Sequence, residues 1–357
     1  MATAYTVPTE APESDGTLTW DRTTVVVVEP HWEHGASGLG YAYGTPAMVG
    51  LIEGVLAPQV VGHPLDDPRG AWRRMVDAVR NLGRPGLCSM AIAAVEIALW
   101  DGLGRWRELP LHRLLGGSRD EVPIYGSGGF CSLSDRQLQR QLGQWVEAGI
   151  PRVKMKIGGG WGADPKEDLR RIGLARKAVG PTTELYVDAN GAYDGTTARE
   201  LGRAAHERHG VAWFEEPVSS DDLRGLARLR SELALDVTAG EYGYTLAYFG
   251  QMLEADAVDV LQADVSRCAG IGEWLRVADA AAARMVPLSG HCAPTLHAAA
   301  ATVPANLRHL EYFHDHVRVD RLLFDGLPQQ VGGELRLGPE PGLGVRLRRE
   351  AARFRVS

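Results

Sequence analysis

The 357-residue sequence has few cysteines, and they are widely scattered. The four cysteines are Cys88, Cys131, Cys268 and Cys292, and none forms a C-x-x-C pair. This scatter argues against a disulfide framework and against a thiolate zinc site of the usual spacing. It favours a reducing compartment.

The sequence also lacks features of export, of membrane insertion and of nucleic-acid binding. The first residues, MATAYTVPTEAPESDG, have no basic start and no apolar core, so they do not resemble a secretory signal. We find no stretch of about 18 apolar residues, which predicts that nothing spans a membrane. The net charge is −7 and no Lys/Arg-rich run is present, which sets nucleic acid aside. A cytoplasmic enzyme is the expectation.

The first third of the chain predicts a small α+β domain. Thr23–Glu29 is β-branched and predicts a strand, with Gly38–Tyr43 as its returning partner. Cys88–Leu103 is Ala-rich, largely apolar and free of Gly and Pro until its end, which is typical of a mostly buried helix. Residues 1–118 are therefore expected to form an N-terminal sheet followed by helices.

From Glu121 onward, short β-rich runs alternate with amphipathic runs. Eight predicted strands that alternate with helices indicate a parallel, closed (β/α) barrel, assigned to residues 119–326. The predicted strands are Val122–Tyr125, Arg152–Ile157, Glu184–Asp188, Val211–Phe214, Leu235–Thr238, Ala257–Leu261, Met285–Leu288 and His309–Phe313. The predicted helices include Pro165–Val179, Thr196–Arg208, Asp221–Leu233, Leu246–Glu254, Ile271–Arg284 and Thr295–Ala301. Residues 327–357 are rich in Gly and Pro and are expected to return to the N-terminal domain.

Acidic residues stand at regular intervals along the predicted barrel. Asp188 precedes Glu215 by 27 residues, and Glu215 precedes Glu241 by 26, which is about one strand–helix unit each time. Because active sites of such barrels lie at the carboxyl ends of the strands, the three carboxylates are expected at equal height on neighbouring strands. They repel one another unless a cation lies among them, and all-oxygen ligation predicts Mg²⁺. The alternative is three solvated acids with an accidental spacing.

Two lysines alternate with apolar residues on the second predicted strand. Lys154 and Lys156 share one face of it, because successive strand residues point to opposite sides. Facing the barrel interior, each lysine should lower the pKa of the other by repulsion, and burial acts in the same direction. A lysine close to neutrality is a usable general base. The alternative is an edge strand with solvated lysines, but a closed barrel has no edge.

A histidine and a carboxylate end the seventh and sixth predicted strands. His291 and Asp264 should be close enough for the carboxylate to orient the imidazole. The pair is a candidate second base or acid opposite the lysine. His297, in an Ala-rich stretch, is expected to be structural, and His206 and His209 are expected on the surface.

The succession of motifs KMK, VDANGAY, WFEEP, AGE, QADVSRCAGI, SGHCAPTLHAA, HLEYF and PGLGV resembles the mandelate racemase and muconate lactonizing enzymes of the enolase superfamily. The resemblance spans essentially the whole chain and implies a modified TIM barrel capped by an N-terminal α+β domain that the C-terminal tail completes. It implies Mg²⁺ on the residues matching Asp188, Glu215 and Glu241. It implies one base at Lys156, a second at His291 with Asp264, a substrate-carboxylate hydrogen bond at Glu311, and assistance from Lys154. The muconate branch would have a lysine where Asp264 stands, so the likeness is to the racemase and acid-sugar dehydratase branch.

One competing function is that of an NAD-dependent oxidoreductase. Gly158–Ala163 matches G-x-G-x-x-A after a strand, which alone suggests a dinucleotide site. The preceding strand would have to bury two lysines, and Asp188 lies too far along to be the acidic partner of that motif. A non-catalytic binding protein is the other candidate, but no base or metal ligand is missing.

Within the enzyme interpretation, the same residues serve two reactions. One base can remove the proton α to a small-molecule carboxylate and the other can return it to the opposite face, which racemises or epimerises the substrate. Alternatively, the second base donates a proton to a departing β-hydroxyl, which dehydrates a sugar acid. We favour dehydration, because the expected capping loop, residues 10–22, is acidic and rich in hydroxyl groups. Its Trp20, together with Asn190, is the candidate substrate contact, and a capped barrel mouth favours a homo-oligomer.

Overall fold

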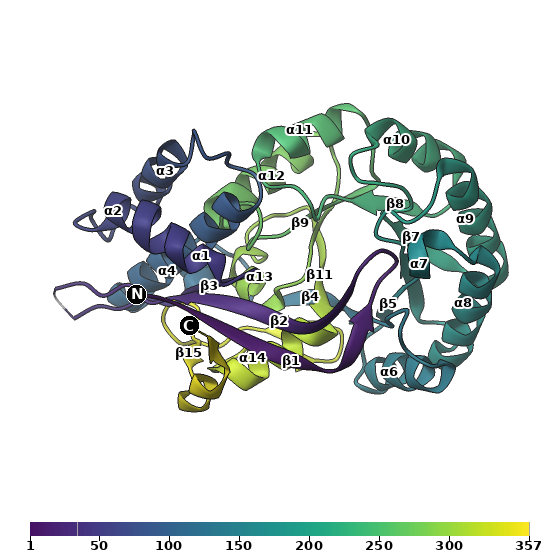
Figure 1. Cartoon of the computed structure of the whole chain (residues 1–357), viewed down its shortest axis with the longest axis horizontal. Helices are drawn as coiled ribbons and strands as arrows, with labels where there is room; N and C mark the ends of the chain where they lie inside the picture. Colours follow the sequence, from purple (N-terminus) through teal and green to yellow (C-terminus); the bar gives the residue numbers. More distant parts are fainter. Residues whose placement is uncertain (34, 357) are drawn as a thin grey trace.

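A computed structural model describes residues 1–33 and 35–356, and its centre is a closed barrel of eight parallel strands (Figure 1). The strands follow one another in chain order, and the last pairs with the first to close the barrel. They are β4 (Glu121–Gly128), β5 (Arg152–Lys156), β6 (Glu184–Asp188), β7 (Val211–Glu215), β8 (Asp236–Ala239), β9 (Val260–Ala263), β10 (Leu288–Gly290) and β11 (Leu307–Phe313). The predicted enolase-type (β/α) barrel is therefore confirmed.

Each barrel strand divides its side chains between two environments. Outward-pointing apolar residues such as Val153, Met155 and Val187 join the main core under the helices. Inward-pointing residues form a separate aromatic layer, in which Tyr186 stacks on Trp213 at 5.1 Å between ring centroids. Because side chains alternate along a strand, the next inward positions lie one layer closer to the carboxyl ends, and these positions carry the ionisable groups.

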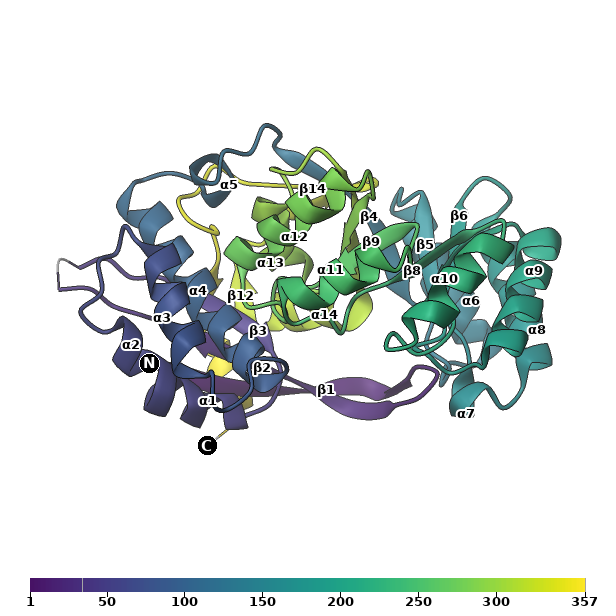
Figure 2. The ribbon, with the colours of Figure 1, turned by 90° about the horizontal axis from the view of Figure 1, so that it is seen from above.

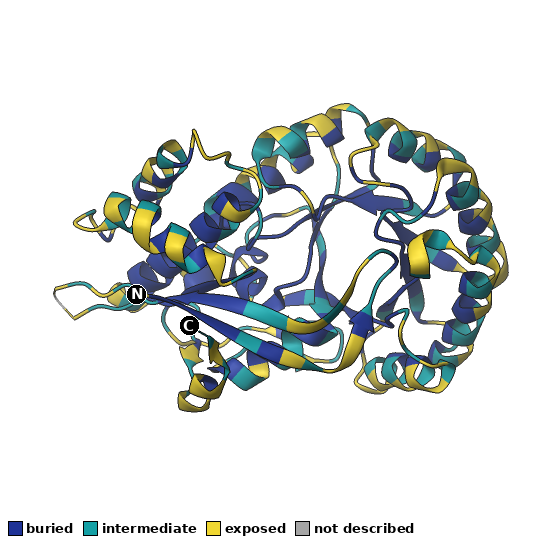
Figure 3. Cartoon of the chain, viewed as in Figure 1, coloured by how far each residue is buried: buried dark blue, intermediate teal, exposed yellow. Residues whose placement is uncertain are grey.

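Helices cover the outside of the barrel, and most of them bury the face toward the strands and expose the other (Figure 3). Asp164, Asp194 and Asp222 accept backbone N–H groups at three of the helix starts, which satisfies donors that a helix leaves unpaired. The helices are α6 (Asp135–Glu147), α7 (Gly159–Gly162), α8 (Pro165–Val179), α9 (Gly195–His209), α10 (Leu223–Glu232), α11 (Leu246–Glu254), α12 (Ile271–Ala283), α13 (Pro294–Ala300) and α14 (His314–Leu323).

The N-terminal domain is a small antiparallel sheet with helices on it. Its sheet order is β16-β1-β2-β3, so the C-terminal strand β16 (Arg355–Val356) pairs with the N-terminal strand β1 (Ala2–Ser14). The remaining strands are β2 (Thr19–Val28) and β3 (Gly40–Tyr43). The helical segments are α1 (Ala47–Leu51), η1 (Ile52–Leu56), α2 (Ala57–Val60), α3 (Pro68–Ala78), α4 (Leu87–Trp106) and α5 (Leu111–Leu114).

Helix α4 corrects one expectation from the sequence. Its 20 residues are long and apolar enough to cross a membrane by length and composition, so the statement that no such stretch exists was wrong. However, 89% of the apolar window is buried inside the structure. Gly40 lets β3 approach α4 closely, since a Cβ at this position would lie 2.3 Å from the backbone nitrogen of Ala98. The apolar composition of α4 is that of a core helix.

A β-hairpin from the N-terminal domain crosses the carboxyl ends of the barrel strands (Figure 2). Its turn, between β1 and β2, lies against the barrel, where the backbone oxygen of Gly16 accepts a hydrogen bond of 2.9 Å from Trp161. A Cβ on Gly16 would lie 2.4 Å from the backbone oxygen of Ala189, so only glycine fits there. The segment 10–22, expected as a loop, is largely strand, because Glu13 and Ser14 pair with Trp20 and Thr19 on the two sides of a short turn.

The C-terminal segment makes three separate contacts. β13 (Gln329–Val331) and β14 (Glu334–Arg336) form a hairpin that pairs with β4 at the amino end of the barrel. β15 (Arg346–Leu347) pairs with β12 (Phe324–Asp325), and the 3-10 helix η2 (Arg349–Phe354) leads into β16. The tail thus contacts both the barrel and the N-terminal sheet.

Candidate active site

Three buried carboxylates converge at the carboxyl ends of neighbouring strands. Asp188 ends β6, Glu215 ends β7 directly beside it in register, and Glu241 follows β8. One oxygen of each lies within 4.8 Å of the others, and all three side chains are buried. Burial, followed by repulsion from Asp188, raises the pKa of Glu215 to about 8. The sequence-predicted carboxylates are therefore brought together, and the set fits an oxygen-preferring divalent cation.

The two lysines point into the same cavity and are paired with these acids. Lys154 Nζ lies 2.5 Å from Glu215 Oε1, 2.8 Å from Glu311 Oε1 and 3.3 Å from Asp188 Oδ2. Lys156 Nζ lies 2.5 Å from Asp188 Oδ2. Burial would lower the pKa of each lysine, but the surrounding carboxylates outweigh it and raise both pKa values. The prediction of lowered lysine pKa values was wrong, because it considered the two lysines without the acids that face them.

His291 lies on the opposite wall and is oriented by Asp264. His291 Nδ1 is 2.9 Å from Asp264 Oδ2, and Nε2 is 3.3 Å from Glu241 Oε2. Strands β5 and β10 are separated by β4 and β11 on one side and by β6 to β9 on the other, so Lys156 and His291 face each other across the barrel. Burial acts to lower the pKa of His291, but Cys292, Glu241 and Glu311, with the hydrogen bond to Asp264, outweigh it and raise that pKa. The predicted pair is therefore present on the wall opposite the lysine.

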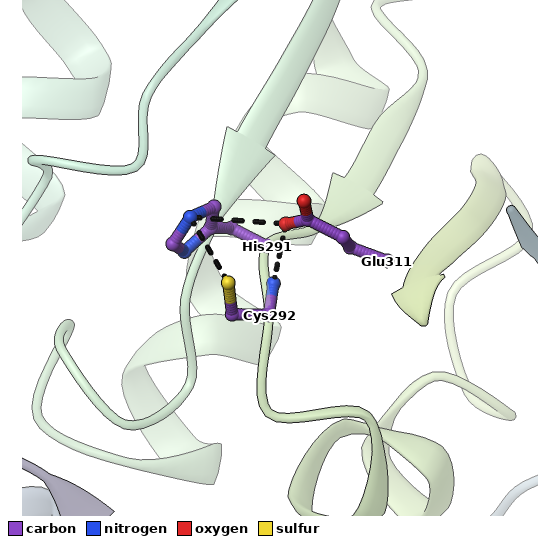
Figure 4. A group of neighbouring side chains, drawn as sticks. All are labelled: His291, Cys292 and Glu311. Atoms are coloured by element: carbon purple, nitrogen blue, oxygen red, sulfur yellow. Dashed lines mark hydrogen bonds and ion pairs between the residues drawn. The ribbon is translucent and has the colours of Figure 1, made fainter. Parts of the chain in front are cut away.

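Glu311 on β11 is held from several sides. Its Oε1 accepts from Ser127 Oγ at 2.5 Å and pairs with Lys154, and its Oε2 accepts the backbone N–H of Cys292 at 2.8 Å. Although burial opposes it, Lys154 and His291 lower the pKa of Glu311, so this carboxyl is ionised. Figure 4 shows His291, Cys292 and Glu311 together.

The two candidate substrate contacts lie in different positions. Asn190 is buried, adopts a left-handed conformation with φ 48°, and its Oδ1 has no hydrogen-bond partner among the described residues. Trp20, on β2, is half-buried, and its Nε1 donates to Glu13 Oε2 at 3.1 Å. Its ring packs edge-on against Phe130 at 5.5 Å, in a cluster that includes Cys292. Asn190 is adjacent to the carboxylates, since its backbone N–H donates to Asp188 Oδ1 at 2.9 Å, whereas Trp20 belongs to the capping hairpin.

Four functional neighbours were missed from the sequence. Ser127 is uncharged and gave no signal. Cys292 and Glu216 each directly follow a residue already assigned, His291 and Glu215. Arg267 lies 3.2 Å from Glu241 Oε1 and 3.7 Å from Asp264 Oδ2. Its position three residues after Asp264 is the feature of the sequence that could have identified it. Glu216 is fully buried with no hydrogen-bond partner for either oxygen in the described chain, and burial and Glu241 raise its pKa well above the usual value.

The remaining histidines have structural positions. His297, on α13, accepts the backbone N–H of Val265 at 2.9 Å and lies 3.0 Å from the backbone oxygen of Cys292. Its ring thus forms hydrogen bonds to the loops after β9 and β10, the loops that carry Asp264 and His291. His206 and His209 are half-buried near the end of α9, where His206 Nδ1 lies 2.9 Å from the backbone oxygen of Val211 at the amino end of β7. The Gly158–Ala163 motif follows a barrel strand and not a strand of a doubly wound sheet, so its dinucleotide interpretation fails.

Comparisons with known families cover nearly the whole chain. Residues 1–116 match the family model described as mandelate racemase/muconate lactonizing enzyme, N-terminal domain. Residues 137–351 match the model described as enolase C-terminal domain-like.

Individual relatives agree with these matches. A crystal structure of a mandelate racemase/muconate lactonizing enzyme-like protein from Rubrobacter xylanophilus is 48% identical, has a TM-score of 0.96, and the match covers 100% of this chain and 98% of that one. An arabinonate dehydratase from Saccharolobus solfataricus is 31% identical over 91% of this chain and 88% of its own length. The L-talarate dehydratase from Polaromonas sp., solved with Mg and L-glucarate, is 28% identical with a TM-score of 0.90, over 100% of this chain and 96% of that one.

Proposed function

Because the chain belongs to the mandelate racemase/muconate lactonizing enzyme family of the enolase superfamily, we propose that it dehydrates a sugar acid. The reaction begins with removal of the proton α to the carboxylate, which forms an enediolate, and continues with loss of the β-hydroxyl as water. The observation that carries this proposal is the placement of Lys156 and His291 on opposite walls around the three carboxylates.

The α-proton passes to Lys156 Nζ in this mechanism, which requires the neutral amine. Asp188 raises the pKa of that amine, and it would do so less when its charge is offset by a bound cation. His291, from the other wall, donates a proton to the departing hydroxyl, so the two groups leave from opposite faces. Asp264 holds the Nδ1–H of His291 and thereby directs Nε2 toward the substrate. Arg267 pairs with both Asp264 and Glu241 and keeps the carboxylates of the two neighbouring loops in place.

The substrate carboxylate develops negative charge as the proton leaves. Asp188, Glu215 and Glu241 would hold Mg²⁺, which stabilises that charge when bound. Lys154, fixed between Glu215 and Glu311, places a positive charge at the same wall. The relatives support this assignment, since one is named for dehydrating arabinonate and another was solved with Mg and L-glucarate.

Racemisation or epimerisation is the second candidate, and the same geometry favours it. Two proton-carrying groups on opposite faces of one α-carbon can exchange its configuration without losing water. The capping hairpin favours dehydration, because its buried Glu13 and half-buried Trp20 offer polar groups to a polyhydroxylated substrate. Burial, followed by Asp315, raises the pKa of Glu13 to about 8, so this carboxyl can donate as well as accept a hydrogen bond.

Incubation of the enzyme with Mg²⁺ and a panel of aldonic and aldaric acids in D₂O tests the proposal. Dehydration gives a 2-keto-3-deoxy acid with deuterium at C3, observed by proton NMR. Racemisation instead gives deuterium at C2 of two epimers without loss of water. If no acid in the panel shows either keto product or C2 exchange, the proposed chemistry is wrong.

The cellular setting stays a prediction from the sequence. We propose a cytoplasmic homo-oligomer that acts on a small carboxylate, since the cysteine content suits a reducing compartment and the capping hairpin lies over the barrel mouth. Light scattering after size exclusion measures the oligomeric state, and a monomeric mass at micromolar protein would contradict that part.

A further inference from the structure

Three different donor groups meet beside the proposed base. His291 Nε2 lies 3.3 Å from Cys292 Sγ and 3.7 Å from Glu311 Oε2, and the three ligand atoms all lie within 4.8 Å of one another (Figure 4). All three side chains are buried. They come from the loop after β10 and from β11, so this set shares no residue with Asp188, Glu215 and Glu241.

The spacing of these atoms suits a tetrahedral ion. With zinc–sulfur bonds of about 2.3 Å and zinc–nitrogen or zinc–oxygen bonds of about 2.0–2.1 Å, ligand atoms around tetrahedral Zn²⁺ lie roughly 3.3–3.6 Å apart. The sulfur–nitrogen and nitrogen–oxygen separations here are 3.3 and 3.7 Å. An ion would therefore draw these ligands together by only small side-chain movements. Three protein ligands leave a fourth position for water.

Groups behind the ligands already hold them in the orientation that a metal requires. Ligating histidines usually donate their other ring N–H to a carboxylate, and His291 Nδ1 lies 2.9 Å from Asp264 Oδ2. Ser127 and Lys154 fix the other oxygen of Glu311. The backbone of Cys292 is left-handed, with φ 46°, an unfavourable conformation for a residue with a Cβ. Its N–H donates to Glu311 in this conformation, and its Sγ lies beside His291.

We propose that His291, Cys292 and Glu311 form a second metal site, which takes Zn²⁺ or a similar borderline-soft ion and not Mg²⁺. Binding breaks the Cys292 S–H bond and the Nε2–H bond of the His291 imidazolium, forms sulfur–metal and nitrogen–metal bonds, and releases two protons to solvent. Thiolate and imidazole select soft and borderline ions, whereas Mg²⁺ prefers the all-oxygen set. An occupied site takes the Nε2 lone pair of His291, so Zn²⁺ inhibits turnover without displacing Mg²⁺. The inhibition rests on the proposed function, but the binding does not.

The cysteine spacing in the sequence argued against a thiolate zinc site, and it could not reveal this one. Only one ligand is a cysteine, and Glu311 comes from a different strand. The neighbouring positions of His291 and Cys292 are informative only once the turn after β10 is known to place both side chains on one side.

Co²⁺ titration of the full-length, reduced enzyme in saturating Mg²⁺ tests the binding directly. We expect thiolate-to-cobalt charge-transfer absorption in the near ultraviolet that saturates at one ion per chain and disappears when Zn²⁺ is added. Cys292→Ser should lose this absorption, as should His291→Asn. Cys88→Ser and Cys131→Ser are matched controls that should keep it, and thermal unfolding of every variant checks the fold.

Turnover measurements form a separate arm. In wild type and in the Cys88→Ser control, Zn²⁺ should inhibit Mg²⁺-dependent turnover, and the residual activity of Cys292→Ser should need at least about tenfold more Zn²⁺ for half inhibition. Absence of the charge-transfer band in wild type, its persistence in folded Cys292→Ser, or its removal by Mg²⁺ would overturn the second site. Absence of turnover with every sugar acid would instead count against the proposed function and leave the spectroscopic result standing.

Discussion

Replacing His291 by asparagine should separate the two halves of the proposed reaction. In this mechanism Lys156 removes the α-proton and His291 protonates the leaving hydroxyl from the opposite wall. Asparagine cannot deliver that proton, but its amide can still donate to Asp264, which His291 approaches at 2.9 Å. Keeping a donor to Asp264 is important, because a buried charge left without its partner destabilises a protein by about 3–5 kcal/mol. Alanine would therefore confuse loss of chemistry with loss of structure.

The expected magnitude follows from general acid–base catalysis. A positioned acid or base contributes about 10²–10⁴-fold, which corresponds to roughly 3–5 kcal/mol of barrier. His291→Asn should slow formation of the keto acid by that factor while exchange of the α-proton with D₂O continues. Lys156→Ala should slow exchange and dehydration together. Mg²⁺ affinity should remain close to wild type in both variants.

Proton NMR in D₂O measures the two processes in one sample. His206→Asn, at a half-buried residue of α9, and Lys166→Ala, at an exposed residue of α8, are matched controls and should behave as wild type. The reasoning is refuted if His291→Asn dehydrates at the wild-type rate, or if it loses α-proton exchange as completely as Lys156→Ala does.

Three further predictions concern the metal, the buried charges and the cap. Glu241→Gln should weaken Mg²⁺ binding by at least about tenfold in isothermal titration calorimetry, and an unchanged titration would count against the carboxylate site. Lys154→Met leaves Glu215 and its neighbours without their buried cation, so the free energy of unfolding in urea should fall by about 3–5 kcal/mol without Mg²⁺ and by less with it. An equal loss in both conditions would show that metal and lysine do not balance the same charges. Gly16→Ala should raise KM several-fold with little change in thermal midpoint, because its Cβ would lie 2.4 Å from the backbone oxygen of Ala189; an unchanged KM would mean that the hairpin does not close the site.

The barrel and the charged residues of its mouth could be predicted because periodicity and spacing encode them. Asp188, Glu215 and Glu241 recur at the length of one strand–helix unit, and that length places them on adjacent strands. Alternation alone placed Lys154 and Lys156 on one face. Strand ends were less accurate near Met285, which was expected in a strand. It is 91% exposed with φ 57° and ends the turn after α12, and the strand itself begins at Leu288.

What the sequence could not supply is the pairing between distant segments. The pKa of Lys154 depends on Glu215 and Glu311, which lie far along the chain but within 2.8 Å in space. The capping hairpin was expected as a loop, because the turn around Gly16 is recognisable only by what it packs against. Arg267 and Ser127 are ordinary polar residues in the sequence, and they gain a role only from the acids beside them.

Anomalous diffraction from crystals grown with Mn²⁺ in place of Mg²⁺ tests the central claim most directly. The account predicts a single strong peak in contact with Asp188, Glu215 and Glu241, with Lys156 and His291 on opposite sides of it. A peak that touches fewer than three of these carboxylates, or one that has both bases on the same side, would contradict it.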